Sequence, residues 1–156
     1  MIRTERFALT NQEYFKIILT SYLKKRWWII SLLLLSGLLF SLRNEKDSFE
    51  YFLMFFAFFY PIIVLISFWR YSKSKDNKLF LVERFYEISV DSITGILSDG
   101  SESIIKKDNF IKTVELRKYY LLYISKNQFV IFPKKAFINQ QDKDWFILEY
   151  IKKITN

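Results

Sequence analysis

The sequence has 156 residues, of which 51% are hydrophobic and 20% aromatic, and it carries a formal net charge of +8. It contains no cysteine and no histidine, which excludes disulfides, thiol nucleophiles, zinc fingers and every acid–base or metal site that depends on histidine. Residues 1–75 hold 11 Lys/Arg against 5 Asp/Glu, whereas residues 76–156 hold 13 against 11, so the positive excess lies beside long apolar stretches and we expect no nucleic-acid partner.

The N-terminal segment combines a weak strand pattern with the start of a helix. Residues 2–9 alternate poorly between polar and apolar side chains, so they predict at most one short strand. Thr10 and Glu13 have the spacing of a capping box and are followed by an apolar run. This pattern predicts a helix that begins here and continues unbroken into the first apolar stretch.

Two apolar stretches predict a pair of membrane-spanning helices joined as a hairpin. Residues 27–42 and 51–69 contain no Asp, Glu, Lys or Arg. The hydrocarbon core of a bilayer is about 30 Å thick and needs about 20 apolar residues in a helix, so the second stretch is close to full length and the first is slightly short. We therefore predict spans at about 24–42 and 51–69. The candidate membrane-interface residues are Lys24, Lys25, Arg26, Trp27, Trp28, Trp69 and Arg70.

The charges that flank the two spans predict their orientation. Residues 43–50 carry two basic and three acidic side chains, whereas both outer flanks are basic. The positive-inside rule then places both termini in the cytoplasm and the connecting loop outside. We accordingly expect a multi-pass protein of the bacterial inner (cytoplasmic) membrane. Because neither span carries a charged side chain, we do not expect a self-contained transporter or channel.

Small residues and one proline mark positions inside the spans. Small side chains in the first span would let the partner helix approach closely, although serine is also simply tolerated in a span. These residues are Ser31, Ser36, Gly37 and Ser41. In the second span, Pro61 removes one backbone donor, and we expect a kink there.

After residue 78 the pattern changes to that of a β domain closed by a helix. Apolar and polar residues alternate in short runs at 84–90, 92–97, 102–105, 110–116, 119–124 and 129–132. Asp99 and Gly100 form a strong turn signal, and Pro133 ends the last run because proline cannot donate into a ladder. Residues 142–155 have the apolar face of an amphipathic helix.

These elements predict a membrane α-hairpin joined to an α+β domain. The first part is residues 1–75, which comprise the N-terminal segment and the two-helix transmembrane hairpin. The second part is residues 76–156, a cytoplasmic domain in which an antiparallel, pleckstrin-homology-like (PH-like) β-barrel or sheet carries a C-terminal helix. No internal repeat or low-complexity segment is visible.

The order of these elements, together with two short motifs, resembles the YcxB-like family of bacterial membrane proteins. The motifs are the run at 119–125, Tyr-Tyr-Leu-Leu-Tyr-Ile-Ser, and the run at 131–137, Ile-Phe-Pro-Lys-Lys-Ala-Phe. Lys135 stands where arginine is common in the family, and Lys106 and Lys107 occupy the region where the family often has a tryptophan. The resemblance implies a cytoplasmic β domain on a membrane hairpin, and it implies no agreed biochemical activity.

The best candidate for a binding site is the basic motif at the end of the last predicted strand. Its lysines could hold an anionic lipid headgroup or an acidic partner near the membrane surface. In the alternative reading, the proline ends the strand, the phenylalanine fills the core, and the lysines are merely solvated. The candidate residues are Pro133, Lys134, Lys135, Phe137, Lys106 and Lys107.

The function expected from the sequence is binding rather than catalysis. The chain has no glycine-rich phosphate loop, and its carboxylates Asp91, Asp99 and Asp108 fall at strand ends and turns, where aspartate is common. We expect a non-enzymatic inner-membrane protein without cofactor or metal, whose partners are membrane lipids and either another protein or a second copy of itself. The alternative is an immunity protein that protects against a membrane-active bacterial toxin.

Overall fold

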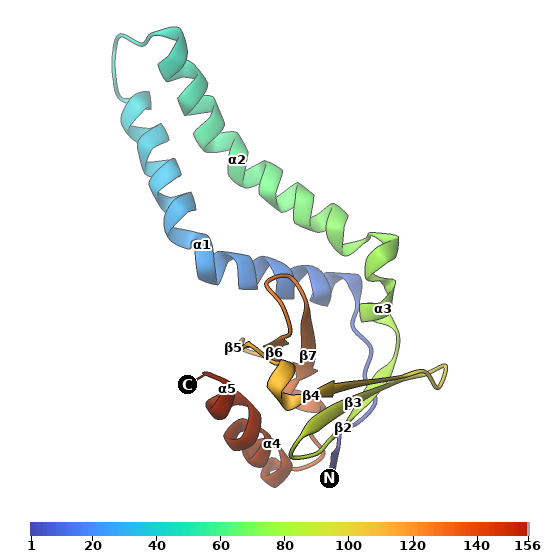
Figure 1. The fold of residues 1–156 in the computed structure, drawn as a ribbon. Coiled ribbons are helices and arrows are strands. Elements are labelled where there is room, and N and C mark those ends of the chain that lie inside the picture. The colour runs from blue at the N-terminus through green and yellow to red at the C-terminus, as the bar shows by residue number, and fades with distance from the viewer. Residues whose placement is uncertain (156) are drawn as a thin grey trace. The chain divides into compact units, whose positions relative to one another are not determined.

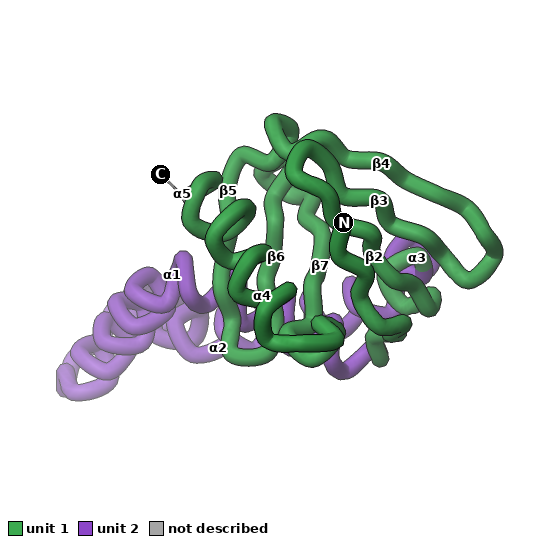
Figure 2. Tube along the Cα trace, turned by 90° about the horizontal axis from the view of Figure 1, so that it is seen from below, with its two compact units in different colours: residues 1–10, 79–156 green, residues 11–78 purple. Residues whose placement is uncertain are grey.

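In a computed structural model, which describes residues 1–155, the chain forms two compact units. Unit 1 contains residues 1–10 and the chain from residue 79 onward, and unit 2 contains residues 11–78 (Figure 2). The sequence placed all of residues 1–75 with the hairpin. The structure instead assigns the first ten residues to unit 1, because their backbone pairs with a strand that follows the hairpin: the Thr4 amide donates to the Tyr86 carbonyl at 2.9 Å.

Unit 2 is a pair of long helices. Helix α1 spans Asn11–Ser41 and helix α2 spans Ser48–Ser72 (Figure 1). Helix α1 begins directly after Thr10 and runs without interruption, as the capping pattern predicts. Asp47 caps α2 by accepting a hydrogen bond from the Glu50 amide at 2.7 Å. A 3₁₀ turn (Lys75–Asn77) and the short helix α3 (Lys78–Leu81) follow, in a stretch for which the sequence analysis predicts no helix.

The two long helices approach closely at a glycine. Gly37 is buried, and a Cβ atom added to it would lie only 2.7 Å from the Cβ of Ala57. Gly37 is one of the small residues that the sequence placed at a helix–helix contact. Nearer the other end of the pair, the hydroxyl groups of Tyr22 and Tyr60 lie 3.3 Å apart.

One helix of the described chain, α2, is long and apolar enough to cross a membrane. Its best window has a mean hydropathy of 2.3, and only 6% of that window is buried. A core helix of a soluble protein would be mostly buried, so its exposure favours contact with lipid. Helix α1 does not meet the same criterion, because its apolar part begins only after the basic residues 24–26 and the helix ends at Ser41.

Unit 1 contains two antiparallel sheets. The four-stranded sheet has the order β1 (Ile2–Arg3), β2 (Arg84–Ile88), β3 (Ser92–Leu97) and β4 (Glu102–Lys106), and the three-stranded sheet has the order β5 (Lys112–Glu115), β6 (Tyr119–Tyr123) and β7 (Phe129–Pro133). The α+β class is therefore confirmed. A closed barrel is not formed by the strands described, since β4, β5 and β7 each pair on one side only.

The C-terminal helix packs on the sheets through aromatic rings. It consists of α4 (Gln140–Phe146), a π-helical turn (Ile147–Lys152) and α5 (Lys153–Thr155). Phe146 is fully buried. The centre of its ring lies 5.0 Å from the ring centre of Phe132, 5.1 Å from that of Phe137 and 5.4 Å from that of Tyr150. Rings at these separations attract one another beyond their area burial, so this cluster holds the helix against the strands.

Candidate functional site: a cavity around Arg84

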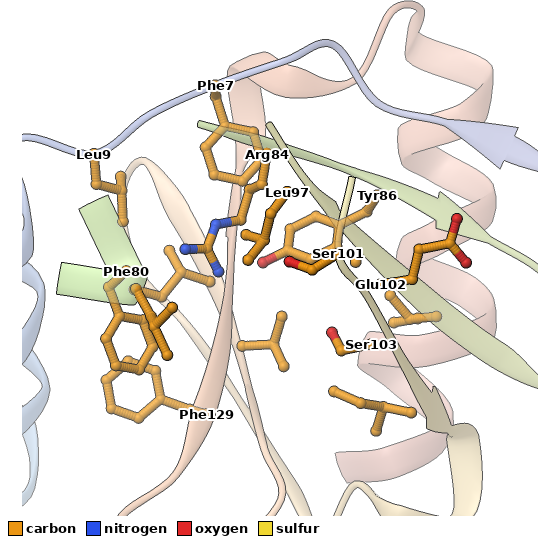
Figure 3. Close-up of a pocket in the computed structure, with 16 residues that line it drawn as sticks. Phe7, Leu9, Phe80, Arg84, Tyr86, Leu97, Ser101, Glu102, Ser103 and Phe129 are labelled. Carbon is orange, nitrogen blue, oxygen red and sulfur yellow. The ribbon is translucent and has the colours of Figure 1, made fainter. Parts of the chain in front are cut away.

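Unit 1 contains a partly open cavity of about 250 Å³ beside strands β2, β3, β4 and β7 (Figure 3). Its walls are mostly apolar and come from both sheets and from the N-terminal segment. They include Phe7, Leu9, Leu97, Phe129 and Ile131. Strands β4 and β7 are sheet edges, so the cavity lies where the two sheets are not joined by strand pairing.

The register of the first sheet creates the cavity's floor. Tyr86 on β2 lies opposite Gly95 on β3, which in turn lies opposite Ser103 on β4. A Cβ added at Gly95 would stand 3.1 Å from Cε1 of Tyr86 and 3.2 Å from Oγ of Ser103. The absence of a side chain at Gly95 therefore lets the Tyr86 ring lie close to the backbone of β3, and both residues line the cavity.

Arg84 supplies the positive charge of the cavity. Its Nε donates to the Val82 carbonyl at 3.3 Å. Its Nη2 is buried and has no hydrogen-bond partner among the residues that the structure describes. Glu102 also lines the cavity, but its carboxylate points away from the guanidinium (Figure 3), and no ion pair joins them in the described chain. Buried polar groups are almost always paired, so this donor is an exception that a ligand would explain.

The tyrosine beside Arg84 is a neutral hydroxyl. Burial raises the pKa of Tyr86, and the neighbouring Arg84 guanidinium opposes part of that rise through its charge and a side-chain hydrogen bond. Because the ordinary pKa of tyrosine is already about 10, Tyr86 keeps its proton at physiological pH. The cavity thus offers a guanidinium and hydroxyl groups at its polar end and apolar side chains elsewhere.

The lysines that the sequence proposed for binding are divided between paired and exposed positions. Lys134 forms an ion pair with Glu115 and lies 4.7 Å from the centre of the Tyr120 ring. Lys107 pairs with Glu149 at 3.1 Å. These two lysines are thereby engaged within unit 1. Lys106 and Lys135 are exposed.

Pro133 and Phe137 lie in the interior. Pro133 is fully buried and is the last residue of β7. Phe137 pairs across an isolated bridge with Thr4, and its ring packs on Phe146. None of the six residues proposed from the basic motif and from Lys106–Lys107 lines the cavity.

Sequence reasoning missed Arg84 and Tyr86 because nothing in the strand that holds them indicates a cavity. The one local signal was Gly95, since a glycine inside a strand often marks a close approach of another group. The sequence assigned Asp91, Asp99 and Asp108 to strand ends and turns rather than to a site. Asp99 accepts hydrogen bonds from the Ser101 amide at 2.9 Å and the Ser101 hydroxyl at 2.6 Å, which lower the pKa of Asp99. It thus stabilises the β3–β4 turn.

The proposed membrane-interface residues all lie exposed on the two long helices. Trp27 and Trp28 are 63% and 56% exposed on α1, directly after the basic residues 24–26. Trp69 is 51% exposed near the end of α2, and the ammonium of Lys73 lies 3.7 Å from the centre of its ring. Exposed tryptophans next to basic side chains are typical of the boundary between lipid and water.

Comparison with protein families agrees with the resemblance noted in the sequence. Residues 88–148 match the family model described as YcxB-like protein. This confirms the family resemblance over most of the two sheets and the start of the C-terminal helix, whereas Arg84, Tyr86 and the hairpin lie outside the matched range. No curated protein and no solved structure matches the chain.

Proposed function

We propose that this chain, whose residues 88–148 match the YcxB-like family, is a non-enzymatic binding protein of the bacterial inner membrane. In this proposal a two-span hairpin anchors unit 1 at the cytoplasmic face. Unit 1 then binds the anionic group of a membrane-derived ligand in the cavity around Arg84. The anionic group could equally be a side chain of a protein partner, and the experiment below separates these two sources.

The arrangement of unit 1 supports a PH-like, open form of the sheet domain. A four-stranded antiparallel sheet is followed in sequence by a three-stranded antiparallel sheet and then by a C-terminal helix. The residues matched to the family span β3 to β7. This likeness rests on the order of elements, and the unjoined edges of β4 and β7 leave the interior accessible.

The chain path of unit 1 supports two membrane crossings. The segment before the hairpin pairs with β2 after it, since Phe7 and Arg84 exchange backbone hydrogen bonds of 2.8 and 2.9 Å. Both ends of unit 2 therefore connect to one folded body, which lies on one side of a membrane. If α2 crosses the bilayer, the chain must cross it a second time, and the apolar half of α1 is the available segment.

The observation that carries the binding proposal is the unpaired donor of Arg84. Leaving a buried donor without a partner costs about 1–3 kcal/mol. An anion in the cavity would remove that cost and would gain a charge-assisted hydrogen bond. The mostly apolar walls lower the effective dielectric constant around the contact, which strengthens the attraction between the opposite charges.

The first prediction is that removal of the Arg84 charge abolishes retention of the ligand. The full chain is extracted from its own membrane with a polymer that keeps surrounding lipid, and bound small molecules are counted by mass spectrometry. We expect about one anionic molecule per wild-type chain and at least a tenfold lower occupancy for Arg84→Met, as the loss of a charge-assisted contact implies. Lys135→Met removes the same charge from an exposed position and should retain the ligand.

Two further results would decide between the candidate sites. Retention that survives Arg84→Met but falls in the double variant Lys106→Glu/Lys135→Glu would contradict the cavity and favour the basic surface. A stoichiometric protein that is lost from Arg84→Met would identify the anion as an acidic side chain of a partner. Equal retention in every variant would overturn the proposal that unit 1 binds an anion.

A further inference from the structure

We propose that the cavity binds a single-chain carboxylate amphiphile of the fatty-acid type. Its carboxylate would contact Arg84 and its hydrocarbon chain would follow the apolar walls. This inference rests on the proposed function, and it names the chemical class of the ligand that the proposed function leaves open.

The charge of the cavity indicates a monoanion. Of the described residues that line it, Arg84 is the only cation and Glu102 is the only acid. A headgroup with several phosphates would bring negative charges that a single guanidinium cannot neutralise, and an unpaired charge in an apolar cavity is strongly unfavourable. Because the Glu102 carboxylate points away from the guanidinium (Figure 3), one carboxylate of a ligand balances the charge of Arg84.

The geometry of the polar end suits a carboxylate. A guanidinium is planar and presents its donors in a fork that matches the two oxygens of a carboxylate. The Nε of Arg84 already donates to a backbone carbonyl, which holds the side chain in place while Nη2 stays free for a ligand. Figure 3 shows the Tyr86 hydroxyl on the same side of the cavity as the guanidinium, where it can donate to the second carboxylate oxygen.

The size and the walls of the cavity indicate one short apolar chain. Its volume of about 250 Å³ lies below the range of roughly 300–1,000 Å³ that holds drug-sized ligands. A phospholipid with two acyl chains would therefore not fit. The rings of Phe80 and Phe129 face each other at 6.2 Å along one wall, and the neighbouring Leu79 is 64% exposed. These side chains give an apolar surface that runs from the cavity to solvent.

The test uses the full chain in nanodiscs of zwitterionic lipid, because detergent would compete for an apolar cavity. Decanoate labelled with ¹³C at its carboxyl carbon is added, and its resonance is followed by NMR against empty nanodiscs. We expect a separate resonance for protein-bound decanoate. Its chemical shift should show that the bound carboxyl group stays ionised to a lower pH than that of decanoate in the lipid, since a guanidinium stabilises the charged form. Decanol, which lacks the charge, should not displace it.

Three variants make the assignment specific. Arg84→Met should weaken decanoate binding by about tenfold or more, and Lys135→Met should leave it unchanged. Ser103→Phe keeps the arginine but fills the cavity, so it should also abolish the bound resonance. If Arg84→Met fails to fold, Ser103→Phe decides the question alone.

The outcomes separate this inference from the proposed function. If decyl phosphate or glycerol phosphate binds in an Arg84-dependent way and decanoate does not, the carboxylate assignment is wrong and the anion-binding function stands. If neither decanoate nor either phosphate binds with dependence on Arg84, both fail. Decanoate binding that Ser103→Phe leaves intact would also overturn the assignment to the cavity.

Discussion

The contact between Tyr86 and Gly95 is the residue-scale feature on which the cavity depends. A Cβ at Gly95 would stand 3.1 Å from Cε1 of the ring, closer than a normal contact, so the ring would have to shift by a few tenths of an ångström. Tyr86 also packs on Phe132 at 4.3 Å between ring centres and on Phe7 at 5.7 Å. A side chain at Gly95 would therefore either displace the ring into the core cluster or occupy the cavity itself.

This contact leads to the second prediction. Gly95→Val should lower the free energy of unfolding of unit 1 by about 1–3 kcal/mol, as overpacking of a filled site usually does. It should also abolish ligand retention. Thermal or denaturant unfolding of the full chain, followed by a probe in unit 1, measures the first effect. In a double-mutant cycle with Tyr86→Ala, the two changes should be strongly non-additive, because valine then takes the space that the ring leaves. Simple additivity would contradict the contact.

Strand register is the reason why the candidate site could not be predicted from the sequence. Arg84, Gly95 and Ser103 come together through the register of three strands, and register is not visible in any one of them. The basic motif, in contrast, was conspicuous in the sequence. Its sequence could not show, however, which of its side chains are engaged in the fold. Lys134 forms an ion pair with Glu115, and the ring of Phe137 packs on that of Phe146, and both contacts form only in the folded unit.

At the scale of elements, the C-terminal helix is fastened to the strands by charge as well as by rings. Glu149 accepts hydrogen bonds from Lys107, in the 3₁₀ turn after β4, and from Lys153, one helical turn further on. These two ammonium groups lower the pKa of Glu149, the Lys153 bond having the larger effect. A carboxylate held in its charged form by the fold contributes stability only where it is ionised.

The third prediction is the pH dependence that follows. A glutamate with a lowered pKa in the folded state contributes fully above its unfolded pKa of about 4.3, and this contribution is lost as pH falls through the folded value. The melting temperature of wild type should therefore exceed that of Glu149→Gln at neutral pH, and the difference should vanish in acid. Glu102→Gln, at a position without an ion pair in the described chain, is the matched control. A constant difference at every pH would show that the ion pair is not responsible.

Most helices and strands could be predicted because they show a local pattern in the sequence, and the exceptions are elements that lack one. Alternation of apolar side chains and the Asp99–Gly100 turn predicted β2, β3 and β4 to within two residues. Helix α3 is only four residues long, too short to show a helical period. The pairing of β1 with β2 joins residues more than eighty positions apart, and no local pattern encodes such a contact. The open arrangement of the two sheets is a long-range property of the same kind.

At the scale of the whole molecule, the hairpin is an insertion in the chain of unit 1. Residues 1–10 precede unit 2 and pair with strands that follow it. If α2 crosses a membrane, as proposed, this chain path requires a second crossing, which hydropathy alone does not indicate. A chain that leaves a folded body and returns to it crosses a bilayer an even number of times. The sequence-based expectation of two crossings rests on a separate observation, namely that both outer ends of the hairpin are basic.

The last prediction tests this topology directly. The chain has no cysteine, so single cysteines at the exposed positions Glu5, Glu45 and Lys126 can be labelled one at a time with a maleimide that does not cross membranes. We expect Glu45→Cys, in the loop between the long helices, to react in spheroplasts, in which the inner membrane is intact and its outer face is accessible to the reagent. Glu5→Cys and Lys126→Cys should react only after the inner membrane is permeabilised. Labelling of all three from the same side would mean that α2 does not cross the bilayer. Labelling of position 5 and position 126 from opposite sides would contradict the β1–β2 pairing, because paired strands cannot lie on two sides of a membrane. It would also contradict the expectation of a second crossing.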